Sequence, residues 1–366
     1  MHDRGIDFSP VYTGEVMDNV SGGLEPGAVY AHNLNLPFTI ALDKLTGWWD
    51  GGMVHANAFW IAGRSISADK VGDLGGVNNI AAYDTVRLHE LWFQQLFWDA
   101  HASLQFGLLA ADDNFFSSDV SALFLNGTFG AFPFVAANLP SPPIYPMGAP
   151  GVRFWIQPVP HLYVQAGVYD GNAEAQNVNR NGIDFRVSRG DGALVFSEIG
   201  WNSDWKLPGT YKLGSFVHTG NFPDWKTGAG EGTDYGIYGV VDQDLYQRGQ
   251  KVISFFTRGG GTPADVNRVD WYVDAGFNFS GFIPGRPDDV AGIALARSFF
   301  SHEFSNSEMS SGSNPFDAET VLEATWKIQI SEWWTLQPDF QYVWSPGGET
   351  SAHNATVLGL RTTIAF

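Results

Sequence analysis

Hydrophobic and polar residues alternate along the last run of the chain, residues 357–366. One face carries Phe366, Ile364, Thr362, Leu360 and Leu358. A period of two indicates a β-strand with two different faces. The run ends on its bulkiest apolar residue, although a soluble chain usually frays at its C-terminus. We therefore expect an ordered final strand with one apolar face.

The same alternation recurs along the whole chain. Clear examples are "WYVDAGFNF" at 271–279, "TVLEATWKIQI" at 320–330 and "TLQPDFQYVW" at 335–344. Sixteen such runs centre on about residues 12, 35, 57, 91, 106, 155, 165, 197, 215, 240, 255, 275, 295, 325, 340 and 361. Gly, Pro, Asn, Asp and Ser separate them, as expected of turns. The only helix that we predict is short, at 42–49.

Composition narrows the class of protein. Charged residues make up 16% of the chain, below the usual ~25%, while aromatic residues reach 15%. This mixture suits strands with one apolar and one polar face. The net charge of −19 makes nucleic acid an unsuitable partner. The chain has no cysteine, which excludes disulfides, thiolate metal sites and a cysteine nucleophile.

Two architectures fit sixteen alternating strands: a soluble β-sandwich and a transmembrane β-barrel. The barrel is favoured, because Gly, Gln, Asn and Ser fill the polar faces and aromatic residues gather near strand ends. We predict an all-β, antiparallel barrel of sixteen strands forming a single domain over 1–366. Its last strand should close onto the first, with Phe366 at the periplasmic interface. The start of the chain shows no signal peptide, so we expect a mature chain with a replaced start or a cytosolic protein.

Residues 120–152 form the longest stretch without charge, 33 residues with six prolines. The prolines exclude a transmembrane helix. A sixteen-stranded barrel encloses a wide aqueous channel, so selectivity requires a constriction. We predict that this loop folds into the lumen and narrows it. An extracellular cap or an oligomer contact would also explain its apolar composition.

Several motifs occur in an order that carries a family resemblance. They include "YTGEVMDNVSGGL" (12–24), "FGLLAADDNFFSSDVSALFLNGTFG" (106–130), "LPGTYKLGSFVHTGNF" (207–222) and "SGFIPGRPDDVAGIALAR" (280–297). In this order the chain resembles the carbohydrate-selective porin family, the OprB type, nearly end to end. The resemblance implies a Gram-negative outer-membrane barrel that lets small sugars diffuse passively, with no enzyme activity and no cofactor. It also implies contact with outer-membrane lipid and with the barrel-assembly machinery through the final strand.

A sugar constriction needs hydrogen-bonding groups for hydroxyls and aromatic rings for sugar C–H faces. The stretch "VRLHELW" offers Arg87, His89, Glu90 and Trp92. Arg87 and His89 share one face of a regular strand, and Glu90 and Trp92 the other. Either a bulge intervenes or one set does not face the lumen; we favour Arg87 inward. A salt bridge at the rim is the alternative role for Arg87.

Other inward-facing candidates follow from alternation: Arg153, Trp155, Tyr163, Tyr272 and, on the closing strand, Arg361. The resemblance adds Asp112 and Asp113, which fall near an acidic stretch of sugar porins. It implies a sugar-gripping arginine at Arg87 and a second one where this chain has Leu108, so glucose specificity stays open. The histidines show no metal-like spacing, so we expect no metal site. Calcium at Asp288 and Asp289 has only weak support.

The sequence leaves other questions open. A monomer and a homotrimer fit equally well, and the identity of the sugar is not indicated. A general or ion-preferring pore is the nearest alternative function. A soluble or surface all-β carbohydrate-binding protein or hydrolase is the alternative from another class. Asp112, Asp113 and Glu90 make poor paired carboxylates for glycoside hydrolysis, because adjacent acids on a strand point in opposite directions.

Overall fold

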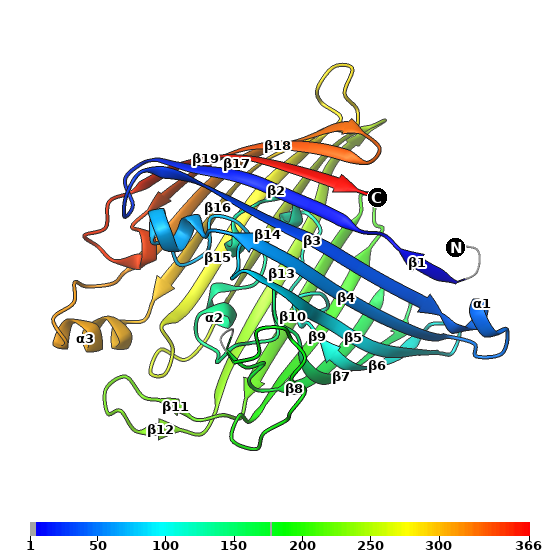
Figure 1. The fold of residues 1–366 in the computed structure, drawn as a ribbon, viewed down its shortest axis with the longest axis horizontal. Helices are drawn as coiled ribbons and strands as arrows, with labels where there is room; N and C mark the ends of the chain where they lie inside the picture. The colour runs from blue at the N-terminus through cyan, green and yellow to red at the C-terminus, as the bar shows by residue number, and fades with distance from the viewer. Residues whose placement is uncertain (1–4, 176–177) are drawn as a thin grey trace.

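The computed structural model describes residues 5–175 and 178–366. Within these residues, sixteen long strands form one antiparallel sheet that closes on itself (Figure 1). They are β2 (Val11–Ser21), β3 (Gly27–Ala41), β4 (Gly52–Gly63), β5 (Thr85–Phe97), β6 (Ala102–Leu109), β7 (Ala149–Val159), β8 (Leu162–Asp170), β9 (Ala193–Ser203), β10 (Gly209–His218), β13 (Asp234–Arg248), β14 (Lys251–Gly261), β15 (Val269–Ser280), β16 (Val290–Phe300), β17 (Ala318–Ser331), β18 (Trp334–Trp344) and β19 (Ala355–Ala365). All sixteen predicted runs are therefore confirmed.

Closure joins the end of the chain to its beginning. β19 pairs with β2, with Leu360 opposite Val16, and the Phe366 N–H donates to the Pro10 carbonyl at 3.0 Å. A short additional strand, β1 (Ile6–Phe8), pairs with the far end of β3. A closed ring leaves no unpaired backbone edge facing lipid, which a bilayer requires. The expectation that the start of the chain has been replaced concerns residues 1–4, which lie outside the described residues.

The two faces of the wall differ as the alternation predicts. Large apolar side chains such as Val16, Leu213, Trp271 and Leu360 are exposed on the outer face. Trp98, Trp201, Trp333 and Phe366 are exposed, and each lies at or beside the strand end on the C-terminal side of the barrel. Charged and amide side chains occupy the inner face, where they are buried.

The connections at the two ends differ in length. At the end with the C-terminus they are short, and the longest contains α1 (Leu42–Thr46), which confirms the predicted helix in part. The opposite end carries long loops, residues 64–84, 110–148, 171–192, 219–233 and 301–317. Smaller elements lie in these loops: η2 (Ser67–Val71), η3 (Ser121–Leu123), η4 (Gly127–Phe129), α2 (Pro133–Ala136), β11 (Phe222–Pro223), β12 (Gly230–Glu231), α3 (His302–Ser310) and, in a further loop, η5 (Pro346–Gly348).

Two details differ from the sequence-based expectation. The helix α3 was missed, because its residues are mostly polar and give no apolar period; Ser301 caps it by accepting a hydrogen bond from the Phe304 N–H. The long apolar loop spans 110–148 rather than 120–152, since residues 149–152 already pair within β7. No helix in the described part of the chain is long and apolar enough to cross a membrane.

Candidate constriction of the channel

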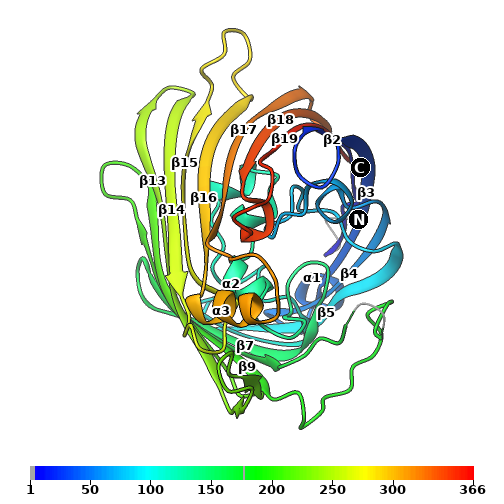
Figure 2. The same ribbon diagram turned by 90° about the vertical axis from the view of Figure 1, so that its left-hand side faces the viewer.

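The loop 110–148, hereafter the lumen loop, lies inside the ring of strands (Figure 2). Acidic side chains on the inner wall accept hydrogen bonds from its backbone. Glu323 on β17 accepts from the N–H groups of Leu125 at 2.6 Å and Asn126 at 2.9 Å. Glu198 on β9 accepts from the Phe116 N–H at 2.9 Å. Charge-assisted bonds of this kind hold the loop against the wall from β9 to β18.

A buried ion pair holds the next part of the lumen loop. Arg258 on β14 donates to the carbonyls of Gly130 at 2.7 Å and Thr128 at 2.9 Å, and it pairs with Asp274 on β15 at 2.6 Å. Tyr272 donates to the same Thr128 carbonyl at 2.7 Å. Tyr272 therefore faces inward as predicted, but it is 2% exposed and covered by the loop. Its contacts are those of an anchor.

Apolar side chains of the lumen loop complete the attachment. Buried aromatic residues of the loop pack against buried aromatic residues of the inner wall. The loop supplies Phe115, Phe116, Phe124, Phe129, Phe132 and Phe134, and the wall Phe196, Phe216, Tyr238 and Phe256. This packing explains why the loop is apolar although it lies in a channel.

Two cavities lie on opposite sides of the lumen loop. One, of about 560 Å³, lies toward the long-loop end and is lined by residues of loops 64–84 and 110–148, including Asn79 and Tyr145. The other, of about 680 Å³, lies toward the C-terminal end and is lined by residues of β15–β19, including Arg361. Arg361 donates to Asn79 Oδ1 at 2.7 Å, so this contact joins the linings of both cavities.

The region between the two cavities, hereafter the narrow region, contains Arg361 and Tyr145. Glu15 on β2 accepts from Arg361 at 2.9 and 2.8 Å and holds it in place. The Tyr145 hydroxyl donates to the Ile80 carbonyl at 2.7 Å. Burial and the charge of Glu15 raise the pKa of Tyr145 above its usual range, while Arg361 and Arg87 act in the opposite direction.

The β5 strand contains the bulge that the sequence left open. Asn57 on β4 pairs with Glu90 and the next residue, Ala58, pairs with Leu88, so His89 is the extra residue. The extra residue shifts the alternation by one position. Arg87, His89, Glu90 and Trp92 consequently share the inner face, while Val86 and Leu91 are exposed on the outer one.

Arg87 faces inward but is covered, being 1% exposed. It donates a hydrogen bond to the Tyr83 hydroxyl. Among the described residues its Nε has no hydrogen-bond partner. Residues 180–182 lie over this part of β5, where the Leu88 N–H donates to the Asn181 carbonyl at 2.9 Å.

The remaining predicted residues fall into two groups. Asp112 lines the cavity at the long-loop end, and it accepts from the Tyr145 N–H at 2.9 Å. Asp113 exposes 55% of its side chain. The other group faces inward beside the anchored loop: Arg153 donates to Gln165 at 2.6 and 2.9 Å, Tyr163 donates to Glu198 at 2.8 Å, and the Trp155 ring stacks 6.3 Å from that of Tyr163.

Sequence reasoning missed part of the narrow region. Alternation along β19 placed Arg361 inward, but nothing in the sequence joined it to Asn79 or Tyr145. Tyr145 lies in the apolar loop without a periodic signal. Leu108 is 2% exposed and lies close to Gly148, where it offers no polar group.

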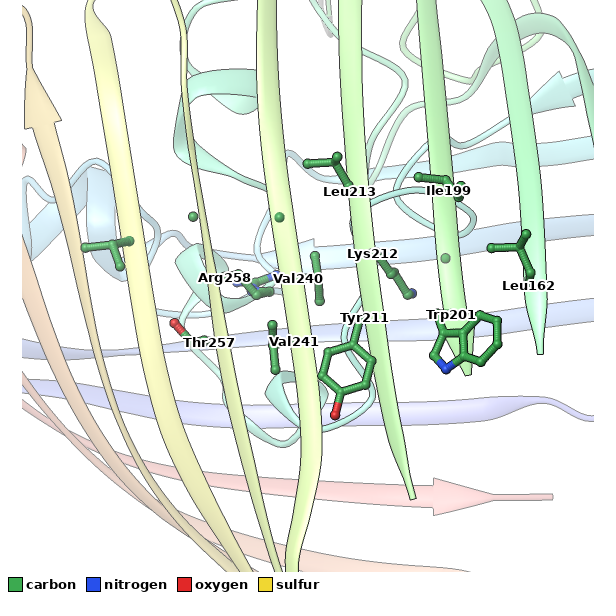
Figure 3. Close-up of a pocket in the computed structure, with 14 residues that line it drawn as sticks. Leu162, Ile199, Trp201, Tyr211, Lys212, Leu213, Val240, Val241, Thr257 and Arg258 are labelled. Carbon is green, nitrogen blue, oxygen red and sulfur yellow. The ribbon is translucent and has the colours of Figure 1, made fainter. Parts of the chain in front are cut away.

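A groove on the outer wall is separate from this region (Figure 3). It has a volume of about 510 Å³ and arises where Gly239 on β13 pairs with Gly259 on β14. Leu213 and Val273 flank the two glycines in the same cross-strand row. These positions alternate with the inward-facing Val240, so the groove faces away from the lumen.

Comparisons with known proteins agree with the geometry. The model of the carbohydrate-selective porin, OprB family, matches residues 25–366. The chain is 25% identical to Porin B of Pseudomonas aeruginosa, over 100% of this chain and 88% of that protein. A high-pH structure of Pseudomonas putida OprB superposes with a TM-score of 0.91 at 24% identity, covering 100% of this chain and 95% of that one. The channel DcaP of Acinetobacter baumannii gives a TM-score of 0.60 at 10% identity, covering 99% and 97% of the two chains.

Proposed function

Because the chain belongs to the carbohydrate-selective porin family of the OprB type, we propose that sugars cross its barrel between the lumen loop and the wall formed by β19 and β2–β5. The protein is an outer-membrane porin of a Gram-negative bacterium, a transport channel through which small sugars diffuse passively. It performs no chemistry on the sugar. The lumen loop is the constriction.

One observation carries this proposal. The contact between Arg361 and Asn79 is shared by the linings of the two cavities that flank the lumen loop. The loop fills the opposite part of the lumen and is anchored there by Glu323, Glu198 and Arg258. A solute that crosses the barrel therefore passes beside Arg361.

The chemistry of the narrow region suits a sugar. Arg361 offers guanidinium donors, Glu15 a carboxylate acceptor and Tyr145 an aromatic face. Arg87 is a second candidate, because its unpartnered Nε–H could donate a hydrogen bond to the oxygen of a sugar hydroxyl. On this account Arg361, on the same side of the lumen as Arg87, supplies the second arginine, while Leu108 occupies the position where the resemblance implies one in related porins. Asp112 and Asp113 line the approach from outside.

The test is sugar flux through a channel in which the ion pair has been neutralised. Changing Arg361→Gln together with Glu15→Gln removes both charges of the ion pair, so neither of its two members is left charged and alone. We expect weaker block of ion current by a monosaccharide in planar bilayers and a smaller difference between mono- and disaccharide rates in liposome swelling. Lys327→Gln, in the cavity on the C-terminal side, is the control. Unchanged sugar block in the double variant would place the path elsewhere.

The finer assignments concern partners. We propose that the exposed apolar belt contacts outer-membrane lipid and that β19, with Phe366, is the segment that the barrel-assembly machinery recognises. These proposals do not depend on the oligomeric state, because the passage is formed by one chain. A homotrimer would contain three such passages.

A further inference from the structure

Three potential metal ligands come together where the bulge of β5 meets the start of the lumen loop. His89, Glu90 and Asp113 each offer one ligand atom, and these atoms lie within 4.8 Å of one another. His89 and Glu90 are adjacent in sequence, and only the bulge turns both to the inner face. Asp113 arrives from a different segment, so the sequence showed no ligand spacing.

The His89 ring is fixed with one nitrogen available. Its Nδ1 lies 3.2 Å from the Pro146 carbonyl, which accepts the Nδ1 proton and leaves the lone pair on Nε2. Nε2 lies 4.0 Å from Asp113 Oδ2. The ring stacks on Phe59 at 4.5 Å and is 3% exposed. A carbonyl that orients an imidazole in this way is the usual outer support of a metal-binding histidine.

The two carboxylates provide an independent observation. Glu90 is 5% exposed, and no lysine or arginine within residues 5–175 and 178–366 forms an ion pair with it or with Asp113. Glu90 Oε1 accepts a long hydrogen bond from the Ala110 N–H at 3.4 Å, and Glu90 Oε2 lies 3.7 Å from His55 Nε2. The other nitrogen of His55 is hydrogen-bonded to Thr39 at 2.8 Å. Two close carboxylates without a fixed cation require either a shared proton or a bound cation.

We propose that His89, Glu90 and Asp113 bind one divalent transition-metal ion such as Zn²⁺, with His55 bordering the site. An imidazole ligand favours zinc and its neighbours over calcium or magnesium, which prefer oxygen alone. Zinc bonds of about 2.0–2.2 Å require the three ligand atoms to draw together by roughly 1 Å. Asp113 can supply this movement because more than half of its side chain is exposed. The same exposure gives the ion a route from the water of the lumen.

The experiment is calorimetric titration of zinc chloride into chelator-treated, folded channel in detergent, without sugar. We expect one Zn²⁺ per chain, with affinity weakened at least about tenfold by Asp113→Asn. Asp113 is exposed, so this variant should fold. Asp119→Asn, an exposed aspartate of the same loop, is the matched control and should bind normally.

Three results would overturn the proposal: no saturable zinc binding by the wild-type channel, equal affinity in Asp113→Asn, or equally tight binding of calcium. His89→Gln provides a second variant from the wall. The first of these results would assign the two carboxylates to a shared proton. Because binding is measured in the absence of sugar, failure here leaves the sugar path untouched, and loss of sugar flux leaves the metal site untouched.

Discussion

The two sides of the lumen differ in how many of their buried polar atoms have a hydrogen-bond partner in the protein. On the side from β9 to β18, the carboxylates of Glu198 and Glu323 are satisfied by backbone N–H groups of the lumen loop. On the side formed by β19 and β2–β5, several buried polar atoms have no partner among the described residues. They are Glu15 Oε1, Asn33 Oδ1, Asn57 Oδ1, Arg87 Nε and Trp92 Nε1.

This difference shows how one alternating wall can do two jobs. Buried polar groups are normally hydrogen-bonded, so groups left without a protein partner mark where water or a polar solute completes the bonding. On the loop side most wall groups bond to the lumen loop, and the buried atoms there without a partner among the described residues are fewer: Asp234 Oδ2, Asn278 Oδ1, Ser331 Oγ and Asp339 Oδ2. The opposite side keeps donors and acceptors for what passes through the channel.

Variants that remove the contacts between the lumen loop and the β9–β18 wall should have the largest effect on stability and conductance. Arg258→Met removes the donor to Thr128 and Gly130 and leaves Asp274 buried without its partner. We expect a loss of about 3–5 kcal/mol in the free energy of unfolding, measured by denaturant unfolding in detergent. Single-channel conductance should rise, because the lumen loop loses its hold.

The control replaces both partners. Arg258→Met with Asp274→Leu leaves no unpaired buried charge, so most of the lost stability should return while the loop contacts stay absent. Conductance should then remain raised. A double variant as unstable as the single one, or a single variant with normal conductance, would contradict the anchoring role.

Changing the passage side should alter sugar recognition with little effect on stability. Tyr145→Ala removes an aromatic face from the lining of the cavity at the long-loop end. The expected loss is on the order of 1 kcal/mol, about fivefold in the sugar concentration that blocks ion current. Tyr145→Phe keeps the ring and should fall between the two. Equal block in all three channels would remove Tyr145 from the path.

A change in the loop segment that covers Arg87 should have the smallest effect on the channel. Gly182 has φ +65°, and an added Cβ would lie 2.0 Å from the Leu88 carbonyl. Gly182→Ala should therefore push residues 180–182 away from β5 and make this segment more sensitive to protease, with a slight rise in conductance. Gly190→Ala is the matched control, since its Cβ would meet nothing closer than 3.6 Å. Identical digestion of the two variants would contradict the covering role.

Alternation was sufficient to predict the barrel. In each strand the alternation of apolar and polar residues shows which face is apolar and which is polar. Closure of the sheet follows because unpaired backbone groups at a free edge are unfavourable in lipid. The exceptions are local: α3 is too polar to show a period, and the bulge at His89 inverts the alternation within β5.

The narrow region could be predicted only in part. Arg361 and Arg87 lie on strands, and alternation placed both inward. Asn79, Tyr145 and Asp113 lie on loops, whose course depends on contacts between distant segments rather than on a local period. For the same reason Tyr272, an inward residue by pattern, is covered by the lumen loop.

The most direct test of the passage uses the absence of cysteine from the chain. Asn79→Cys places one thiol in the narrow region, and Ser118→Cys places one between the lumen loop and β13, where Ser118 is buried against Asp242. A charged methanethiosulfonate reagent is then added during single-channel recording. The account predicts a stepwise fall in current for Asn79→Cys and none for Ser118→Cys. A fall confined to Ser118→Cys, or an equal fall in both, would show that solutes cross on the side that the lumen loop fills.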